Sequence, residues 1–139
     1  MYPNSDDIDI NENLYFSRGA MDSALNSNDP EVLRSVILAG GDVNIDLGDG
    51  WTPLHCAFDL AIDGMIQNNQ DAPYPEAIEI IRILVAHGAD LDKKNREGKT
   101  PLDAINTYAG NEEDFNSLMA MFRSVIPALD DKIKYQKRE

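Results

Sequence analysis

Residues 50–57, which read Gly-Trp-Thr-Pro-Leu-His-Cys-Ala, constrain the fold of this chain more than any other stretch. Thr52 is a good helix N-cap, and Pro53 at the first helical position lacks the backbone N–H that would otherwise be left unpaired. Gly50 lets the backbone reverse just before this helix. Leu54 then faces inward. The stretch therefore predicts a sharp turn followed by a helix that packs against other helices.

The same pattern returns 48 positions later, where residues 98–104 read Gly-Lys-Thr-Pro-Leu-Asp-Ala. Upstream of it, residues 88–92 match residues 40–44 at the same offset. One such unit cannot bury its own apolar face, so copies of it must stack to form a core. The repeat therefore predicts a row of stacked helical units.

These residues resemble the ankyrin repeat signature Gly-x-Thr-Pro-Leu-His-x-Ala. The resemblance implies an all-α fold, a short ankyrin-repeat α-solenoid of about three helix-pair repeats. An ankyrin unit has about 33 residues, so the observed spacing implies a roughly 15-residue insertion in the middle repeat. The likeness covers roughly Tyr15 to Phe122. The motif itself is present in the second and third repeats. The first repeat is inferred by counting back from Gly40, which places Gly19 at the threonine position.

Apolar residues at helical spacing mark the expected helices and the loops between them. A long helix from Thr52 is followed by the polar stretch 67–75, which we expect to be an exposed loop, and Glu76 begins the partner helix. Gly88 ends that helix, and Thr100 with Asp103 resembles a capping box at the start of the third repeat. The apolar positions expected to face the core are Leu54, Phe58, Ala61, Ile62, Met65, Ile78, Ile81, Leu84, Val85, Phe115, Leu118, Met119 and Phe122.

Three segments are expected along the chain. Residues 1–11 hold three aspartates and little apolar content, which is typical of a flexible acidic tail. Residues 12–127 form the ankyrin repeat domain. Residues 128–139 form a capping turn after Pro127 and a charged tail that we expect to be frayed.

The formal net charge of −13 narrows the classes of partner. Nucleic acid and anionic membranes both attract positive surfaces, so we expect neither as a partner, whereas a basic protein fits. Solubility alone also explains such a charge. A single cysteine excludes an intrachain disulfide, and with no leader-like or membrane-length apolar run we expect a cytoplasmic setting.

Residues with catalytic or metal-binding potential are few. His55 and Cys56 are adjacent, so on a helix they point about 100° apart rather than toward each other. The resemblance instead implies a structural role for His55, hydrogen-bonding within and between repeats. The glycine-rich segment with Asp46 and Asp49 lacks the bidentate acid that a calcium loop places twelve positions on. We therefore expect no enzyme, no cofactor and no metal site, and an enzyme using His55 and Cys56 is the least supported alternative.

Partner contacts are expected along the two fingers that join the repeats, residues 45–51 and 93–99, and along the inner helix that begins at Thr52. The first finger is acidic and the second is mainly basic, an arrangement that favours a partner of opposite polarity, although ordinary solvated turns also explain it. Trp51 either contacts the partner or packs on its own finger. The inserted loop adds an aromatic residue. The predicted partner-binding residues are Asp46, Asp49, Trp51, Asp59, Asp63, Tyr74, Lys93, Lys94, Arg96 and Lys99.

A small acidic ankyrin chain is similar to the ankyrin immunity proteins that neutralise bacterial toxins. This resemblance implies an inhibitor that occludes a toxin or enzyme with a basic surface through its concave face, fingers and inserted loop. The alternative is a scaffold or adaptor that links two proteins without inhibiting either. The sequence indicates neither the partner's identity nor an oligomeric state.

Overall fold

The computed structural model describes residues 10–137, with side chains from Arg18 onward, and the regular secondary structure of this part is all α-helix, joined by turns and loops. The residues expected to form most of the acidic tail, 1–9, and the last two residues lie outside the described part. The helices are α1 (Ile10–Ser27), α2 (Pro30–Leu38), α3 (Pro53–Gln67), α4 (Pro75–Ala86), α5 (Asp103–Tyr108), α6 (Glu112–Phe122) and α7 (Leu129–Lys132).

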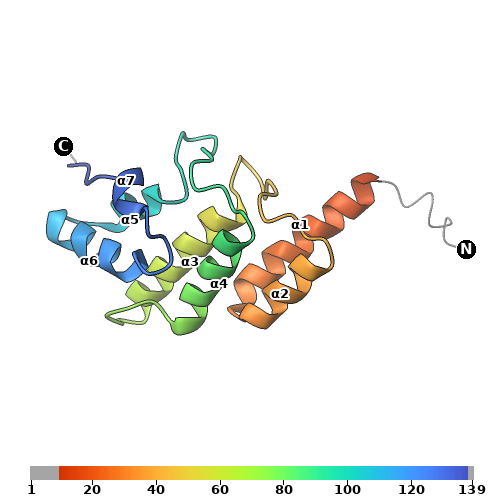
Figure 1. Ribbon diagram of the computed structural model, residues 1–139, viewed down its shortest axis with the longest axis horizontal. Coiled ribbons are helices and arrows are strands. Elements are labelled where there is room, and N and C mark those ends of the chain that lie inside the picture. Colours follow the sequence, from red (N-terminus) through yellow and green to blue (C-terminus); the bar gives the residue numbers. More distant parts are fainter. Residues whose placement is uncertain (1–9, 138–139) are drawn as a thin grey trace, which may run out of the picture.

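The helices form three antiparallel pairs that stack along the long axis of the molecule (Figure 1). Within the pairs, α1 packs on α2, α3 on α4 and α5 on α6. Between the pairs, α3 contacts both α1 and α5, and α4 contacts α2. The inner helices α1, α3 and α5 therefore form one continuous row. This confirms the predicted fold, a short ankyrin-type α-solenoid.

The turn into α3 forms as the sequence predicts. Thr52 is the N-cap, and its hydroxyl accepts a hydrogen bond from the His55 N–H. His55 returns the bond, because its Nδ1 accepts from the Thr52 N–H at 3.1 Å. The two residues thus form a capping box in which histidine takes the place of the usual glutamate.

The equivalent turn in the third repeat is tighter than predicted. The Asp103 carboxylate accepts from the Thr100 N–H at 2.8 Å, which supplies one half of the expected capping box. The backbone N–H groups of Asp103 and Ala104 donate to carbonyls three residues back rather than four. Because this opening turn has 3₁₀ geometry, α5 begins at Asp103 and has only six residues.

A glycine follows the end of α2 and of α4, the second helices of the first two pairs, at equivalent positions of the repeat. Gly40 and Gly88 have φ values of +101° and +91°, which favour glycine. At the end of α4, the Gly88 N–H donates to the Val85 carbonyl and the Ala89 N–H to the Leu84 carbonyl. These two bonds form a Schellman cap, and Gly88 ends the helix as predicted. The start of α4 is one residue earlier than predicted, at Pro75.

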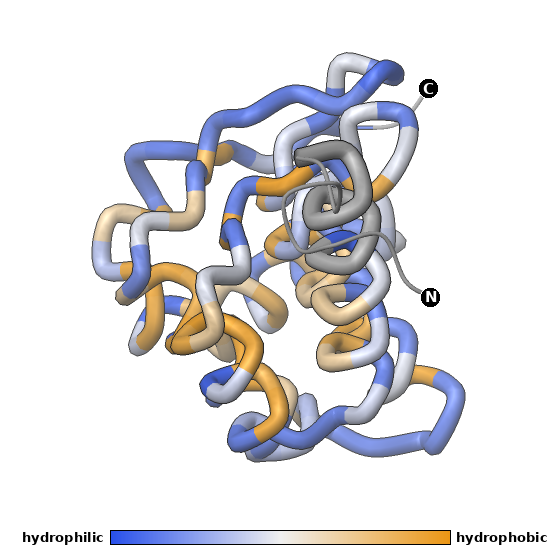
Figure 2. Tube along the Cα trace, turned by 90° about the vertical axis from the view of Figure 1, so that its right-hand side faces the viewer, coloured by the Kyte–Doolittle hydropathy of each residue, from blue (hydrophilic) through white to orange (hydrophobic). Residues whose placement is uncertain are grey.

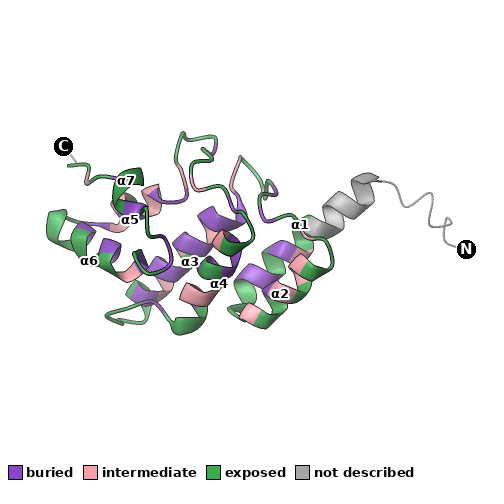
Figure 3. Ribbon diagram, viewed as in Figure 1, coloured by how far each residue is buried: buried purple, intermediate pink, exposed green. Residues whose placement is uncertain are grey.

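A single apolar core runs through the stack (Figure 3). Phe58 on α3 and Phe122 on α6 are fully buried, and their ring centroids lie 4.9 Å apart, so they join the second and third repeats. On α4, Ile78 and Val85 are only half-buried, contrary to prediction, while Ile80 and Ile83 are buried. The buried face of α4 is wider than one stripe because α4 packs on both α2 and α3.

The two ends of the stack differ from the middle. At the N-terminal end, α1 continues through Gly19, so the first repeat has no turn at its threonine position, and α1 starts ahead of the boundary expected at residue 12. At the other end, Asn106 holds the segment after α7. Its side chain donates to the Lys134 carbonyl at 2.9 Å and accepts from the Gln136 N–H at 3.0 Å. The prediction of a frayed tail is therefore wrong up to Gln136.

The fingers and the loop after α3 lie at opposite ends of the helix pairs. The fingers project from one edge of the molecule and are mostly hydrophilic (Figures 1 and 2). The loop that follows Gln67 emerges at the other end of α3, which spans roughly 22 Å at 1.5 Å per residue. Any surface that includes the fingers is thus separated from this loop by the length of α3.

Candidate protein-binding site

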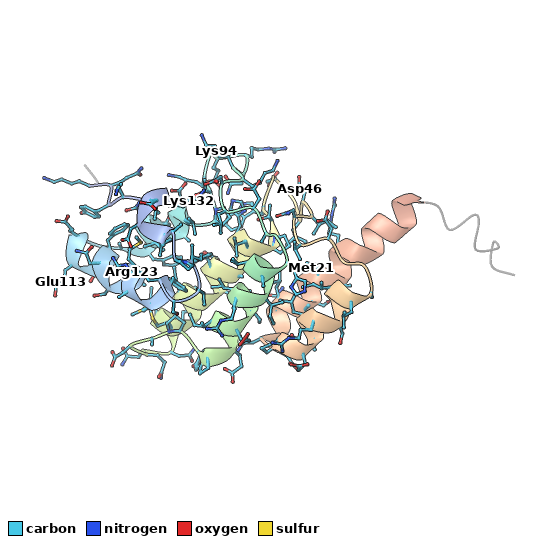
Figure 4. All side chains as sticks on the ribbon, viewed as in Figure 1. Met21, Asp46, Lys94, Glu113, Arg123 and Lys132 are labelled. Atoms are coloured by element: carbon cyan, nitrogen blue, oxygen red, sulfur yellow. The ribbon has the colours of Figure 1, made fainter. Side chains whose placement is uncertain are left out.

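The first finger is closed by its own aspartate. Asp46 accepts hydrogen bonds from the N–H groups of Gly48, at 2.7 Å, and Gly50, at 3.1 Å. The Gly48 N–H is the largest reason that the pKa of Asp46 is lowered. Its side chain nonetheless stays exposed on the finger edge (Figure 4). Asp46 therefore shapes the turn as well as adding charge to the surface.

The two fingers contact each other directly. The Arg96 guanidinium lies 3.0 Å from the Asp49 carboxylate, and the Arg96 N–H donates to the Asp49 carbonyl at 2.8 Å. A Cβ on Gly50 would lie 2.9 Å from the Asn95 Cα, so the backbones approach as closely as glycine allows. Asp49 and Arg96 offset each other across this contact, so the fingers are less polarised than their sequences alone indicate.

Lys93 and Lys94 lie on the exposed edge of the second finger, where Figure 4 labels Lys94. Together with Asp46, Asp49 and Arg96 they line an open hollow between the two fingers. Charges of both signs share this hollow. It favours a partner surface that is itself mixed in charge.

His55 links the second repeat to the third. Its ring is buried, and Nε2 lies 2.8 Å from the Lys99 carbonyl oxygen of the second finger. Since Nδ1 accepts from the Thr52 N–H, the proton is on Nε2, which donates to that carbonyl. Burial lowers the pKa of His55, so the imidazole is neutral. These contacts support the structural role that the family resemblance implies.

Cys56 lacks the environment of a reactive thiol. It is partly buried, and its pKa is raised to about 11, chiefly by burial and then by the carboxylates of Asp22 and Asp59. No hydrogen bond joins it to His55 in the described part of the chain, and the tautomer of His55 places a donor toward Lys99 instead. The adjacent pair therefore has no nucleophile and base geometry.

A pocket of about 260 Å³ lies between the second finger and the inner helices α3 and α5, and we name it the Trp51 pocket. Trp51 is half-buried and packs on His55, with ring centroids 5.5 Å apart. Both interpretations of Trp51 thus have support, because the ring packs on its own repeat and also lines an open surface. The other lining residues are His55, Asp59, Asn95, Glu97, Lys99, Thr100, Pro101, Asp103, Ala104, Thr107 and Tyr108.

Asp59 connects the inner helices within this pocket. The Tyr108 hydroxyl on α5 donates to the Asp59 carboxylate on α3 at 2.6 Å. Burial and the Asp59 carboxylate raise the pKa of Tyr108, so the hydroxyl stays protonated and remains a donor. Asp63, one turn further along α3, accepts from Gln67 at 2.9 Å and is outside the pocket.

The predicted site residues fall into two neighbouring groups, with Asp63 and Tyr74 outside both. Trp51, Asp59 and Lys99 line the Trp51 pocket. The hollow between the fingers holds Asp46, Asp49, Lys93, Lys94 and Arg96. Tyr74 is the N-cap of α4, at the opposite end from the fingers, and is 38% exposed. Their roles in binding remain predictions.

Sequence reasoning did not single out Tyr108 or Glu97 as site residues, and it treated Asp103 only as a capping residue. The sequence offered a clue to Tyr108. The repeat offset of 48 residues places it one position after the residue equivalent to Asp59. Neighbouring inner helices therefore bring the two side chains together. Glu97 had no such signal, since its position depends on how the second finger folds.

Neither a metal centre nor a membrane span is evident in the part of the chain that the structure describes. Within residues 18–137, where the side chains are described, no three side chains of histidine, cysteine, aspartate or glutamate gather where they would hold an ion. None of the described helices combines the length and the apolar character needed to cross a bilayer.

Comparisons with known proteins agree with this architecture. The ankyrin repeat family model matches residues 49–96, from the first finger through α3 and α4 to the second finger. Mouse protein phosphatase 1 regulatory subunit 27 is 32% identical over 104 residues, which cover 75% of this chain and 54% of that protein. The potassium channel AKT1 of Oryza sativa subsp. indica is 34% identical over 101 residues, covering 73% of this chain and 9% of the channel.

Mouse protein phosphatase 1 regulatory subunit 12A is 38% identical over 76 residues, 55% of this chain and 6% of that protein. The chain thus spans about half the length of one of these relatives and less than a tenth of the other two. The stacked helix pairs and these matches define a helical-repeat module of the protein-binding class. The chain is an ankyrin repeat protein.

Proposed function

We propose that this chain is an inhibitor of the immunity type, which covers the active surface of a basic enzyme or toxin with its finger edge and Trp51 pocket. The observation that carries the proposal is the charge of this pocket. Asp59, Glu97 and Asp103 supply three carboxylates against the single amine of Lys99, beside an indole ring. A basic partner surface would find complementary charge and an aromatic contact in the same place.

The physical mechanism is steric occlusion aided by long-range attraction. The formal net charge of −13 steers a basic partner toward the chain and raises the association rate by roughly ten- to a thousandfold at low salt. Trp51 packs on His55 before any partner arrives, so little side-chain entropy is lost on binding. Inhibition follows if the covered partner surface includes its active site.

The names of the relatives favour an enzyme as the partner. Two of them are named as regulatory subunits of a protein phosphatase. On that likeness, we place the partner of this chain among enzymes. The competing function is a scaffold or adaptor, which would leave the partner's activity unchanged.

The inserted loop takes a smaller part in this proposal. Tyr74 lies at the far end of α3 from the fingers, so only a partner wide enough to span roughly 22 Å contacts both. The Tyr74→Ala variant tests this directly. Unchanged affinity would restrict the interface to the finger edge and the Trp51 pocket.

The decisive experiment measures a captured partner's activity with and without the chain. The partner is captured from the native host with the full chain as bait, identified, purified, and assayed alone and in complex. The proposal expects loss of partner activity in the complex and weaker binding as salt rises. Full activity in the complex would establish the adaptor, and binding indifferent to salt would refute the electrostatic mechanism.

A matched pair of variants assigns the interface. Glu97 is exposed and lines the Trp51 pocket, whereas Glu113 is also exposed but lies on α6, outside the pocket (Figure 4). Each is changed to glutamine, which removes one charge and keeps the shape. We expect Glu97→Gln to weaken binding up to about fivefold and Glu113→Gln to leave it unchanged. Equal effects would mean that only the net charge matters.

A further inference from the structure

We propose that the Trp51 pocket receives the side chain of a single arginine from the partner protein. This inference rests on the proposed function, because it names the chemical group that the pocket recognises. The pocket offers what a guanidinium group requires, namely an aromatic face, carboxylate oxygens with free capacity and walls without a competing buried charge.

The size of the pocket suits one side chain. Its volume of about 260 Å³ lies just below the range of roughly 300–1,000 Å³ for sites that hold drug-sized ligands. Trp51 and Tyr108 supply aromatic surface, and Pro101 and Ala104 supply the apolar remainder. An arginine side chain matches these walls, because its methylene stem is apolar and its planar head stacks on an indole ring.

Two carboxylates in the pocket are each held by one hydrogen bond, and each has a second oxygen available for a ligand. Asp59 accepts the Tyr108 hydroxyl on Oδ1, and Asp103 accepts the Thr100 N–H on Oδ2. Among residues 18–137, no hydrogen bond uses Oδ2 of Asp59 or Oδ1 of Asp103. A guanidinium group has five N–H donors in a planar fork and can bond to more than one carboxylate, whereas a lysine ammonium is a single point of charge.

The remaining polar walls do not oppose a cation. His55 is neutral, and its one N–H is already donated to the Lys99 carbonyl. Lys99 itself contributes the only amine among the lining residues, but its side chain is exposed, so water screens its charge. Glu97 adds a third carboxylate at the finger. The balance within the pocket favours a positively charged ligand.

The test titrates the isotope-labelled full chain with three small probes and follows backbone and indole resonances by NMR. The probes are the N-acetyl methylamides of arginine, of citrulline, which is its neutral isostere, and of lysine. We expect arginine to shift the Trp51 indole resonance and the backbone signals near Asp59 and Asp103. Citrulline should bind at least fivefold more weakly than arginine, and lysine should fall between the two.

Matched variants separate the pocket from the general acidity of the chain. Asp59→Asn keeps an acceptor for the Tyr108 hydroxyl but removes the charge, and Asp103→Asn does the same for the Thr100 N–H. Each should weaken arginine binding about fivefold or more, while Glu113→Gln on α6 should not change it. Folding of every variant is checked by its thermal unfolding midpoint, and two independent pocket variants keep the test valid if one unfolds.

The outcomes distinguish this inference from the function on which it rests. Equal binding of citrulline and arginine, shifts scattered over acidic surfaces, or no effect of both pocket variants would overturn the arginine site. If a partner is still inhibited in that case, the proposed function stands and only the pocket assignment fails. If arginine binds the pocket as expected but the partner keeps full activity in the complex, the inhibitor proposal fails instead.

Discussion

Replacing His55 with alanine tests the link between the second and third repeats. The change leaves the buried Thr52 N–H without its partner, at about 1–3 kcal/mol, and removes one of the two hydrogen bonds that the Lys99 carbonyl accepts, at about 0.5–1.5 kcal/mol. Loss of the Trp51 ring contact adds about 0.5–1.5 kcal/mol. We expect the free energy of unfolding to fall by about 4 kcal/mol, a large share of the roughly 5–15 kcal/mol typical of a domain.

Urea unfolding followed by circular dichroism measures this loss. With a urea dependence of about 2 kcal/mol per molar, the midpoint should fall by about 2 M. The matched control is His87→Ala, because the sequence has two histidines and His87 makes one local bond, to the Ile83 carbonyl at 2.8 Å. That variant should lose about 1 kcal/mol or less. Equal losses in the two variants would refute the bridging role of His55.

The same residue predicts a pH dependence. Burial lowers the pKa of His55 below its ordinary value of 6.5, so near pH 6 the folded chain binds fewer protons than the unfolded chain. Its contribution to stability is therefore complete above about pH 6.5 and is lost as the pH falls toward the lowered pKa. Comparing wild type with His55→Ala between pH 7.5 and 5 should show this slope in the wild type and a shallower slope in the variant.

Three further predictions address the core, the fingers and the cysteine. Phe122→Ala should cost about 3–5 kcal/mol, because Phe122 is fully buried against Phe58; a thermal midpoint shift of only a few degrees would contradict this. Gly50→Ala should destabilise by about 2 kcal/mol in urea, because it adds a clash with the second finger to the strain of a positive φ. Gly98→Ala, with a φ of +77° and open space around it, should cost only about 1 kcal/mol. With a pKa of about 11, Cys56 should react with iodoacetamide at pH 8 about a hundredfold more slowly in the folded chain than in urea, and equal rates would contradict its burial.

Much of the fold was predictable because the second repeat carries local motifs that set where its helices begin and end. The threonine and proline before α3 fixed the helix start, and Gly88 fixed the end of α4, since both are local consequences of hydrogen-bonding capacity and allowed φ. The third repeat was less predictable. Its tight opening turn and short α5 depend on hydrogen bonds three residues apart, which the same motif does not distinguish from a full helical start.

The candidate site was predictable only in part. The charged residues of the fingers could be read from the sequence. The Asp49–Arg96 ion pair, which offsets two of those charges, could not, because it depends on contact between the two fingers. Tyr74 was expected to contribute to the binding surface together with the fingers. It lies at the other end of α3 instead, because a helix of this length separates the residues at its two ends.

The sequence by itself determined the class of fold, the start of α3, the end of α4 and the acidity of the chain. These follow from single residues and their immediate neighbours, where capping, backbone freedom and charge act locally. Only the tertiary structure decided which side chains share a surface. The neutral state of His55, the anchoring of Asp59 by Tyr108 and the existence of the Trp51 pocket all arise where stacked repeats bring residues 44 to 49 positions apart into contact.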